Sequence, residues 1–124
     1  MRTFAEVVES PLAEITRLTD APISFHRCLV PATGGITTAL LLSHAIWVTQ
    51  SLPEDVCGWF TCSSEQWTES TGLSRREQET ARRALCRGGF ITERRYGMPA
   101  RLWSRVNVGV VLAALRGQSA RRVH

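Results

Sequence analysis

The side chains best suited to bind a ligand in this sequence are arginines on one predicted helix, residues 74–87. Successive residues of an α-helix are rotated by about 100°, so Arg76 and Arg83 lie roughly opposite Ala81, with Arg75 beside them. The guanidinium group is planar, always charged and able to donate paired hydrogen bonds to phosphate or to guanine O6 and N7. This face therefore predicts contact with a polyanion. The alternative is an ordinary solvated helix face.

The opposite face of the same helix is small and apolar. Ala84, Leu85 and Gln78 fall within about 60° of Ala81. The angle of Gln78 therefore points inward, which makes it a marginal candidate for contact with a ligand. Small side chains allow another helix to approach closely, so we expect this face to pack against the rest of the protein.

Two helix starts flank a tight turn just before these arginines. Ser63 is followed three residues later by Gln66, and Ser74 is followed by Glu77. In such a capping box the hydroxyl accepts from a free backbone N–H, and the Gln or Glu side chain reaches back to the cap residue. The two caps are eleven residues apart and enclose Gly72. This spacing leaves room for two turns of helix, a turn and a new helix, the outline of a helix-turn-helix motif.

Charge is divided unevenly along the chain, whose formal net charge is +4. Residues 1–63 contain three Arg and six acidic residues, a net charge of −3, whereas residues 64–124 contain twelve Arg and five Glu, a net charge of +7. This asymmetry indicates a polyanionic partner for the second half of the chain.

The composition suits one globular domain. The 124 residues are enough for a single hydrophobic core, and 44% hydrophobic residues with 21% charged residues argue against disorder. We expect a domain over residues 1–116, made of an N-terminal arm (1–33), a core (34–107) and a C-terminal helix (108–116). A mobile basic tail (117–124) would follow.

The four cysteines do not form a metal or redox motif. No pair among Cys28, Cys57, Cys62 and Cys86 has the two-residue spacing of a zinc ribbon. A metal site using His26 is conceivable, but free thiols that act as small apolar groups are favoured. We therefore expect neither a metal nor a cofactor. The N-terminus lacks the apolar run of a secretory signal, so a cytoplasmic location is expected.

No constellation typical of an enzyme stands out. The sequence contains no defensible Ser-His-Asp order, no glycine-rich phosphate loop and no paired carboxylates placed for acid–base chemistry. Glu65 and Glu69 share a helix face, but in a basic region such acids are more simply ion-pair partners. The chain is therefore expected not to be an enzyme.

The remaining elements follow from hydrophobic periodicity and turn residues. In chain order we expect a helical segment at 1–19 interrupted by Pro11, a short strand at 23–30, a turn at 31–35, a buried helix at 36–50, a strand at 58–62, a β-hairpin at 90–107 and an apolar helix at 108–115. The helix at 36–50 is too short and too often interrupted by polar residues to span a membrane. The segment at 1–19 is either an arm on a partner subunit or a cover for its own core.

The predicted hairpin has a basic tip. Residues 97–100 form the turn, and Arg94, Arg95 and Arg101 flank it. Alternation along the return strand places Leu102 on one face with Val106, and Trp103 on the other with Arg105. Such a hairpin lies against the phosphate backbone or enters the minor groove. The alternative is a solvated hairpin without a ligand.

This order of elements resembles the winged helix-turn-helix superfamily, and more narrowly the small winged-helix proteins and replication-initiator N-terminal domains of phages, plasmids and other mobile elements. The residues behind the resemblance are Gly58-Trp59-Phe60 before a capped helix, Trp67, the run Thr71-Gly72-Leu73-Ser74-Arg75, Ala81, Leu85, Gly89-Phe90-Ile91, and the Gly97 hairpin that ends in Val106-Asn107. It covers roughly residues 34–107. The implied fold is α+β, mainly α, a winged helix-turn-helix with a C-terminal β-hairpin wing and extra N- and C-terminal helices.

The resemblance implies double-stranded DNA as the ligand, with residues 74–83 in the major groove and 94–101 as the wing. We expect a transcriptional regulator or accessory factor of a mobile genetic element, acting as a homodimer in the nucleoid. The residues expected to face base edges are Ser74, Arg75, Arg76, Gln78 and Glu79, and those expected to hold phosphates are Arg82, Arg83, Arg94, Arg95 and Arg101. The alternative function is a protein–protein adaptor that does not bind DNA.

Overall fold

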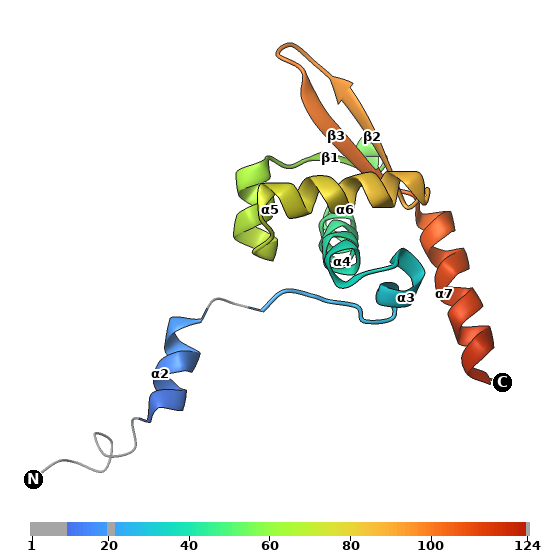
Figure 1. Ribbon diagram of the computed structural model, residues 1–124. Coiled ribbons are helices and arrows are strands. Elements are labelled where there is room, and N and C mark those ends of the chain that lie inside the picture. The colour runs from blue at the N-terminus through green and yellow to red at the C-terminus, as the bar shows by residue number, and fades with distance from the viewer. Residues whose placement is uncertain (1–9, 20–21, 124) are drawn as a thin grey trace, which may run out of the picture.

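Helix α4 (Ile36–Gln50) is the centre of the fold. The computed structural model describes residues 10–19 and 22–123, with side chains up to Gln118. Seven residues of α4 are buried, and the helix contacts neighbours on several sides (Figure 1). The sequence predicted both the bounds of this helix and its burial, and both predictions are confirmed. A helix that is apolar on most faces needs partners all round.

The described part of the chain is a mainly helical α+β fold with one small antiparallel sheet. Besides α4, its elements are α2 (Pro11–Leu18), α3 (Leu29–Thr33), the 3-10 helix η1 (Glu54–Val56), β1 (Trp59–Thr61), α5 (Ser64–Thr71), α6 (Arg75–Arg87), β2 (Ile91–Tyr96), β3 (Arg101–Val106) and α7 (Val108–Val123). Helix α6 crosses α4, and α7 leaves from the base of the β2–β3 hairpin (Figure 1).

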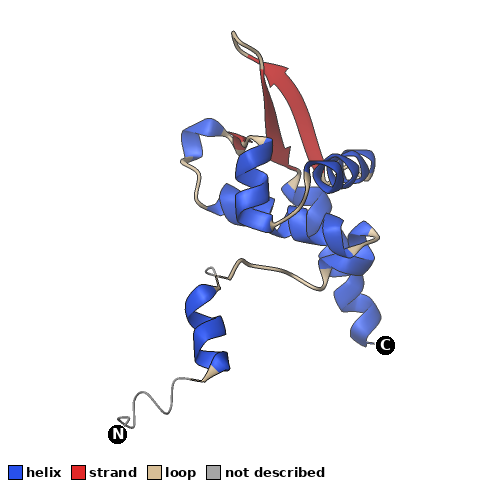
Figure 2. Ribbon diagram, turned by 60° about the vertical axis from the view of Figure 1, so that its left-hand side comes forward, coloured by secondary structure: helices blue, strands red, loops and turns tan. Residues whose placement is uncertain are grey.

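The sheet has the strand order β1-β3-β2, and both neighbouring pairs are antiparallel. Its inner face packs on the helices through Phe60, Ile91 and Val106, which are all buried. The β2–β3 hairpin continues past this contact and projects beyond the helices (Figures 1 and 2). The predicted hairpin and its turn are confirmed, and the predicted strand at 58–62 is confirmed as β1.

The two-helix unit α5–α6 is built by the capping boxes that the sequence predicted. The Ser63 Oγ accepts from the Gln66 N–H at 3.1 Å, and the Ser63 N–H donates to Gln66 Oε1 at 2.8 Å. Gly72 ends α5 with a φ of 75°, a left-handed conformation that glycine adopts without strain. These local hydrogen bonds explain why the turn between the helices is so short.

Aromatic rings join this unit to the core. Trp67 on α5 is 5% exposed, and its ring centroid lies 6.2 Å from that of Phe60 and 5.5 Å from that of His44. Burial lowers the pKa of His44, because desolvation disfavours the charged imidazolium. Trp67 thus anchors α5 to the core.

Three expectations for the ends of the chain are wrong. Residues 23–30 do not form a strand, because no described strand lies beside them to pair with; the chain is extended and then enters α3. Leu29 on α3 is 1% exposed, so the core begins before residue 34. Helix α7 continues through Gly117 to Val123, whereas the sequence predicted that the C-terminal helix ends near residue 116.

Pro11 begins a helix rather than kinking one. It occupies the first turn of α2, where its missing N–H costs no hydrogen bond, and Ser10 caps the helix by accepting from the Ala13 N–H at 3.2 Å. No residue of α2 is buried. The part of the predicted segment before Ser10 lies outside the described residues. None of the described helices is both long enough and apolar enough to cross a membrane.

Candidate nucleic-acid interface

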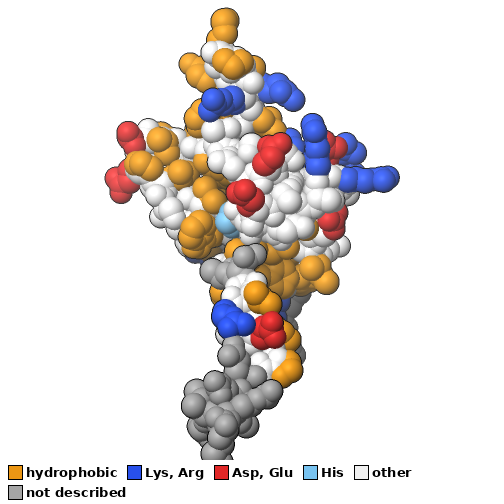
Figure 3. All heavy atoms as spheres, turned by 90° about the vertical axis from the view of Figure 1, so that its left-hand side faces the viewer, with side chains coloured by type: hydrophobic (Ala, Val, Ile, Leu, Met, Phe, Trp, Pro, Cys, Tyr) orange, Lys and Arg blue, Asp and Glu red, His pale blue; other side chains and the backbone are white. Residues whose placement is uncertain are grey.

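The outer face of α6 presents the arginines that the sequence analysis placed there. Arg75, Arg76 and Arg83 are all exposed, while Ala81 and Leu85 on the opposite face are each 1% exposed. The predicted division of this helix into a cationic and a buried face is therefore confirmed. Arginine side chains project from the hairpin and from one edge of the helical body in Figure 3.

One acidic residue lies among these arginines. Arg75 Nε is 3.5 Å from Glu79 Oε1, one helical turn along, and both side chains are largely exposed. An exposed pair of this kind is worth little to stability and exchanges readily with water or another anion. Arg75 is therefore available to a ligand. Arg76 and Arg83 are also available, because they make no ion pair with any described residue.

The first turn of α6 is held by its cap. Ser74 Oγ accepts from the Glu77 N–H at 3.2 Å, and the Ser74 N–H donates to Glu77 Oε1 at 3.0 Å. Hydrogen bonding from the Ser74 backbone, then from its side chain, lowers the pKa of Glu77, because both bonds favour the carboxylate. The Ser74–Glu77 hydrogen bonds thus fix the first turn of α6, where Arg75 and Arg76 lie.

Gln78 must be removed from the predicted site. Its side chain is 2% exposed and faces α5, not solvent. Gln78 Nε2 donates to the Ser64 carbonyl at 3.1 Å, to Thr68 Oγ1 at 2.9 Å and to the Leu73 carbonyl at 3.0 Å, and Oε1 accepts from Ser64 Oγ at 3.2 Å. Its amide is fully used within the protein, so it locks α5 to α6 and cannot read a base edge.

Arg82 links α6 to the hairpin. Its Nε lies 2.6 Å from Glu93 Oε2 on β2, and both side chains are mostly buried. Cys86 Sγ donates to the other oxygen, Glu93 Oε1, at 3.2 Å. Burial, followed by this hydrogen bond and the charge of Glu93, raises the pKa of Cys86 to about 12. Arg82 therefore positions the hairpin relative to α6, which reduces its availability to a phosphate.

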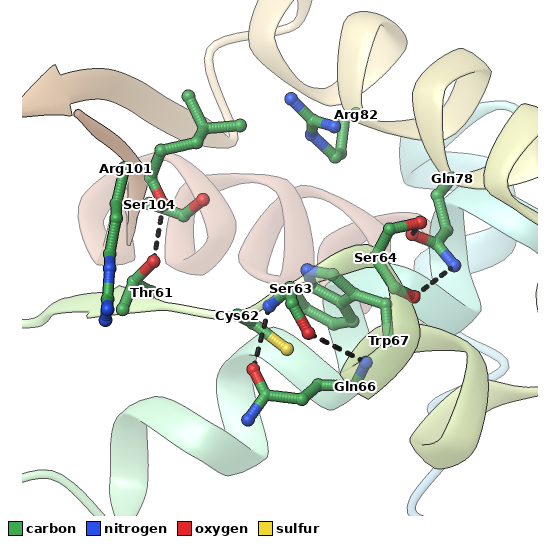
Figure 4. Close-up of a pocket in the computed structure, with 11 residues that line it drawn as sticks. Thr61, Cys62, Ser63, Ser64, Gln66, Trp67, Gln78, Arg82, Arg101 and Ser104 are labelled. Atoms are coloured by element: carbon green, nitrogen blue, oxygen red, sulfur yellow. Dashed lines mark hydrogen bonds between the residues drawn. The ribbon is translucent and has the colours of Figure 1, made fainter. Parts of the chain in front are cut away.

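The arginines of the hairpin lie on different sides of the sheet. The register pairs Arg95 with Leu102 on the inner face, and it pairs Arg94 with Trp103 on the outer face. Arg101 belongs to the outer face by register, but its side chain lies at the sheet edge beside Thr61 (Figure 4). Of the three predicted arginines, only Arg95 thus lies on the same side as α6.

A hollow separates the outer face of α6 from the inner face of the hairpin. It has a volume of about 450 Å³, and Arg75, Arg82, Arg83 and Arg95 line it together with Glu79 and Glu93. These groups come from α6 and β2. The alternation of side chains along β2 points Arg95 and Glu93 toward α6, and the Arg82–Glu93 ion pair joins the two elements. Four guanidinium groups around one hollow, against two carboxylates, favour an anionic ligand.

A second hollow, of about 580 Å³, lies where α5 begins and β1 ends (Figure 4). Ser63, Ser64 and Gln66 line it from the start of α5, and Arg101 lines it from β3. From the sequence, Ser63 is predicted only as a cap residue. Pairing of β1 with β3 brings Arg101, forty residues beyond Thr61 in the chain, to this helix start, and no local sequence pattern predicts that contact.

The cysteines lie apart from both hollows, except for Cys62 and Cys86 at their edges. All four thiols are free, and burial raises the pKa of Cys62 to about 11. A thiol with so high a pKa is neutral near neutral pH and is a poor nucleophile and metal ligand. Within residues 10–19 and 22–123 there is no group of three or more His, Cys, Asp or Glu side chains placed to hold a metal ion.

Comparison of the chain with protein-family models, with curated proteins and with solved structures gives no match.

Proposed function

We propose that this protein binds double-stranded DNA as a winged helix-turn-helix protein. The observation that supports this most directly is the hollow between α6 and the hairpin, around which Arg75, Arg82, Arg83 and Arg95 converge. An exposed cationic helix beside a hairpin that contributes Arg95 to the same hollow matches the shape and charge of a duplex groove flanked by phosphates.

In this proposal the first two turns of α6 enter the major groove. Ser74, Arg75, Arg76 and Glu79 face base edges, since the N-terminal turns of such a helix approach the bases most closely. Arg83, Arg95 and Arg101 hold phosphates. Arg82 and Arg94 have smaller roles, because Glu93 already pairs with Arg82 and Arg94 lies on the outer face of the sheet, away from α6. A regulator or accessory factor of a mobile element is the role that we propose for such binding.

The salt dependence of duplex binding tests this function. We expect a labelled random-sequence duplex, followed by fluorescence anisotropy, to bind at about 50 mM salt and to lose affinity about fortyfold at about 200 mM, as the three phosphate contacts of Arg83, Arg95 and Arg101 require. Absence of binding at both salt concentrations would contradict the proposal and favour the adaptor function. A pull-down for a protein partner would then follow.

We also propose that the protein acts as a homodimer on a two-fold DNA site. Apolar side chains that the described part of the chain leaves uncovered support this: Leu12, Ile15 and Leu18 on α2 are each more than half exposed. We expect light scattering at tens of micromolar to give twice the mass of the chain, alone or with a duplex containing two half-sites about one or two helical turns apart. A mass of one chain under both conditions would argue against the dimer.

A further inference from the structure

The outer face of the sheet contains only three kinds of side chain. Because directly opposite residues of antiparallel strands share a face, the register assigns eight side chains to it. They are Trp59, Thr61, Thr92, Arg94, Tyr96, Arg101, Trp103 and Arg105. Three are aromatic, three are arginines and two are threonines, and none is acidic or aliphatic. Of these eight residues, only Arg94 and Arg101 belong to the predicted DNA site, and none of the three aromatic residues does.

No side chain on this face is buried, whereas the inner face buries Phe60, Ile91 and Val106. Tyr96 is 72% exposed, and Trp59 and Trp103 are both partly exposed. Large aromatic rings are usually placed where they can pack, so a sheet face that leaves Tyr96 exposed and two tryptophans only partly covered needs a reason.

Two arginines contact one of these aromatic rings, that of Trp59. Arg94 Cζ lies 5.5 Å from the centroid of the Trp59 ring, and Arg105 Cζ lies 5.9 Å from it, both within the range of a cation–π interaction. Next to this cluster is a shallow hollow of about 290 Å³ lined by Trp59, Arg94, Tyr96 and Trp103. Its walls are π-faces and one guanidinium plane, which are the surfaces on which a nucleobase stacks.

We infer that the outer face of the sheet is a binding platform for single-stranded nucleic acid. Unpaired bases stack on Trp59, Trp103 and Tyr96, and the phosphates between them are neutralised by Arg94 and Arg105. Stacking on aromatic side chains tolerates any base sequence because every base has a π-face. The platform is separate from the duplex site proposed on α6, and it adds a second ligand class on the opposite side of the hairpin.

A duplex and an acidic protein fit this face less well. Bases stacked inside a duplex cannot cover the aromatic rings, so the duplex would leave Trp59 and Trp103 uncovered. An acidic protein segment would pair with the arginines but would supply no planar groups at the spacing of the rings. An unpaired strand supplies anionic and planar groups in alternation, as this face requires.

The test compares oligothymidine of about twelve nucleotides with an abasic oligomer of the same length, which carries the same phosphates without bases. With the full chain at about 50 mM salt, we expect anisotropy to show oligothymidine binding at least about tenfold more tightly than the abasic strand. Equal binding of the two strands would overturn the platform, because charge alone would then explain the binding. Competition by polyglutamate as strong as by oligothymidine would assign the face to an acidic protein instead.

Variants locate the binding on this face. Trp59→Leu with Tyr96→Leu keeps the charge and apolar character but removes two π-faces, and we expect at least about tenfold weaker oligothymidine binding with duplex binding changed less than about twofold. Tyr96→Leu alone, at an exposed position that cannot disturb the fold, is expected to weaken oligothymidine binding about threefold or more. Unchanged oligothymidine affinity in both variants would overturn the inference.

The matched control is Arg76→Ala with Arg83→Ala. It should weaken duplex binding and leave the preference for oligothymidine over the abasic strand intact, because both arginines lie on α6. The two sets of variants thus separate failure of the platform from failure of the proposed duplex site.

Discussion

Replacing Arg76 and Arg83 together by alanine is expected to weaken duplex binding at least about tenfold while leaving the thermal midpoint nearly unchanged. Both side chains are exposed, and neither makes an ion pair with a described residue. Their loss therefore removes ligand contacts but no folding contact. Alanine also has a helix propensity at least as high as that of arginine, so α6 itself is not weakened.

The salt dependence gives this prediction a second measurement. If Arg83 holds a phosphate, the slope of log affinity against log salt should become less steep by about one, and a base-reading Arg76 should change the affinity with a smaller effect on the slope. Single variants at the two positions separate these roles. Anisotropy titrations at several salt concentrations measure both quantities.

The control for lost positive charge is Arg27→Ala with Arg116→Ala. Both side chains are exposed, on the segment before α3 and on α7, and the change in net charge is the same. We expect this control to bind the duplex within about threefold of the parent, because distant exposed charges are largely screened by salt. If the α6 pair binds as well as the parent does, or if the control loses as much affinity, α6 is not the helix that contacts DNA.

Replacing Gln78 by alanine is expected to lower the free energy of unfolding by about 2–4 kcal/mol, the largest stability effect that we predict for a polar residue. The change removes hydrogen bonds to Ser64, Thr68 and Leu73 and leaves a void where a fully buried side chain packed. Urea unfolding followed by tryptophan fluorescence measures it, since Trp67 lies on the adjoining helix.

Two further variants test the reason for this effect. Gln78→Leu keeps most of the volume, so any loss that remains reports the unpaired polar groups of α5. Gln50→Ala removes an exposed glutamine from another helix and should change stability by less than about 0.5 kcal/mol. A Gln78→Ala protein that is as stable as the parent but binds DNA weakly would restore Gln78 to the base-reading set and contradict our assignment.

Much of the fold could be predicted because its signals are local. The caps at Ser63 and Ser74, the glycine at position 72 and the apolar run at 36–50 each determine their element through residues a few positions away. The two-sided nature of α6 also follows from helix geometry alone. For the same reason the hairpin was predictable from its turn and its alternation.

The predictions that are wrong concern residues whose environment is set by contacts with segments distant in the sequence. On a helical projection of α6, Gln78 lies at the border between the buried and the exposed face. Only the packing of α5 against α6 shows that three acceptors surround its side-chain amide. The start of the core at Leu29 depends on α4 and α7, against which α3 packs. Neither contact can be predicted from the residues next to Gln78 or Leu29 in the sequence.

The sequence by itself determined the helix at 36–50, where α5 and α6 begin, and which face of α6 is cationic, because these depend on hydrogen bonds and periodicity within a few residues. Only the tertiary structure decided the arrangement of the hairpin arginines. Pairing of β1 with β3 places Trp59 beside Arg105, and the pleat then sends Arg94 to the outer face and Arg95 to the hollow beside α6. A one-residue change of register would exchange these faces, and register is set by the burial of Phe60, Ile91 and Val106 against the helices.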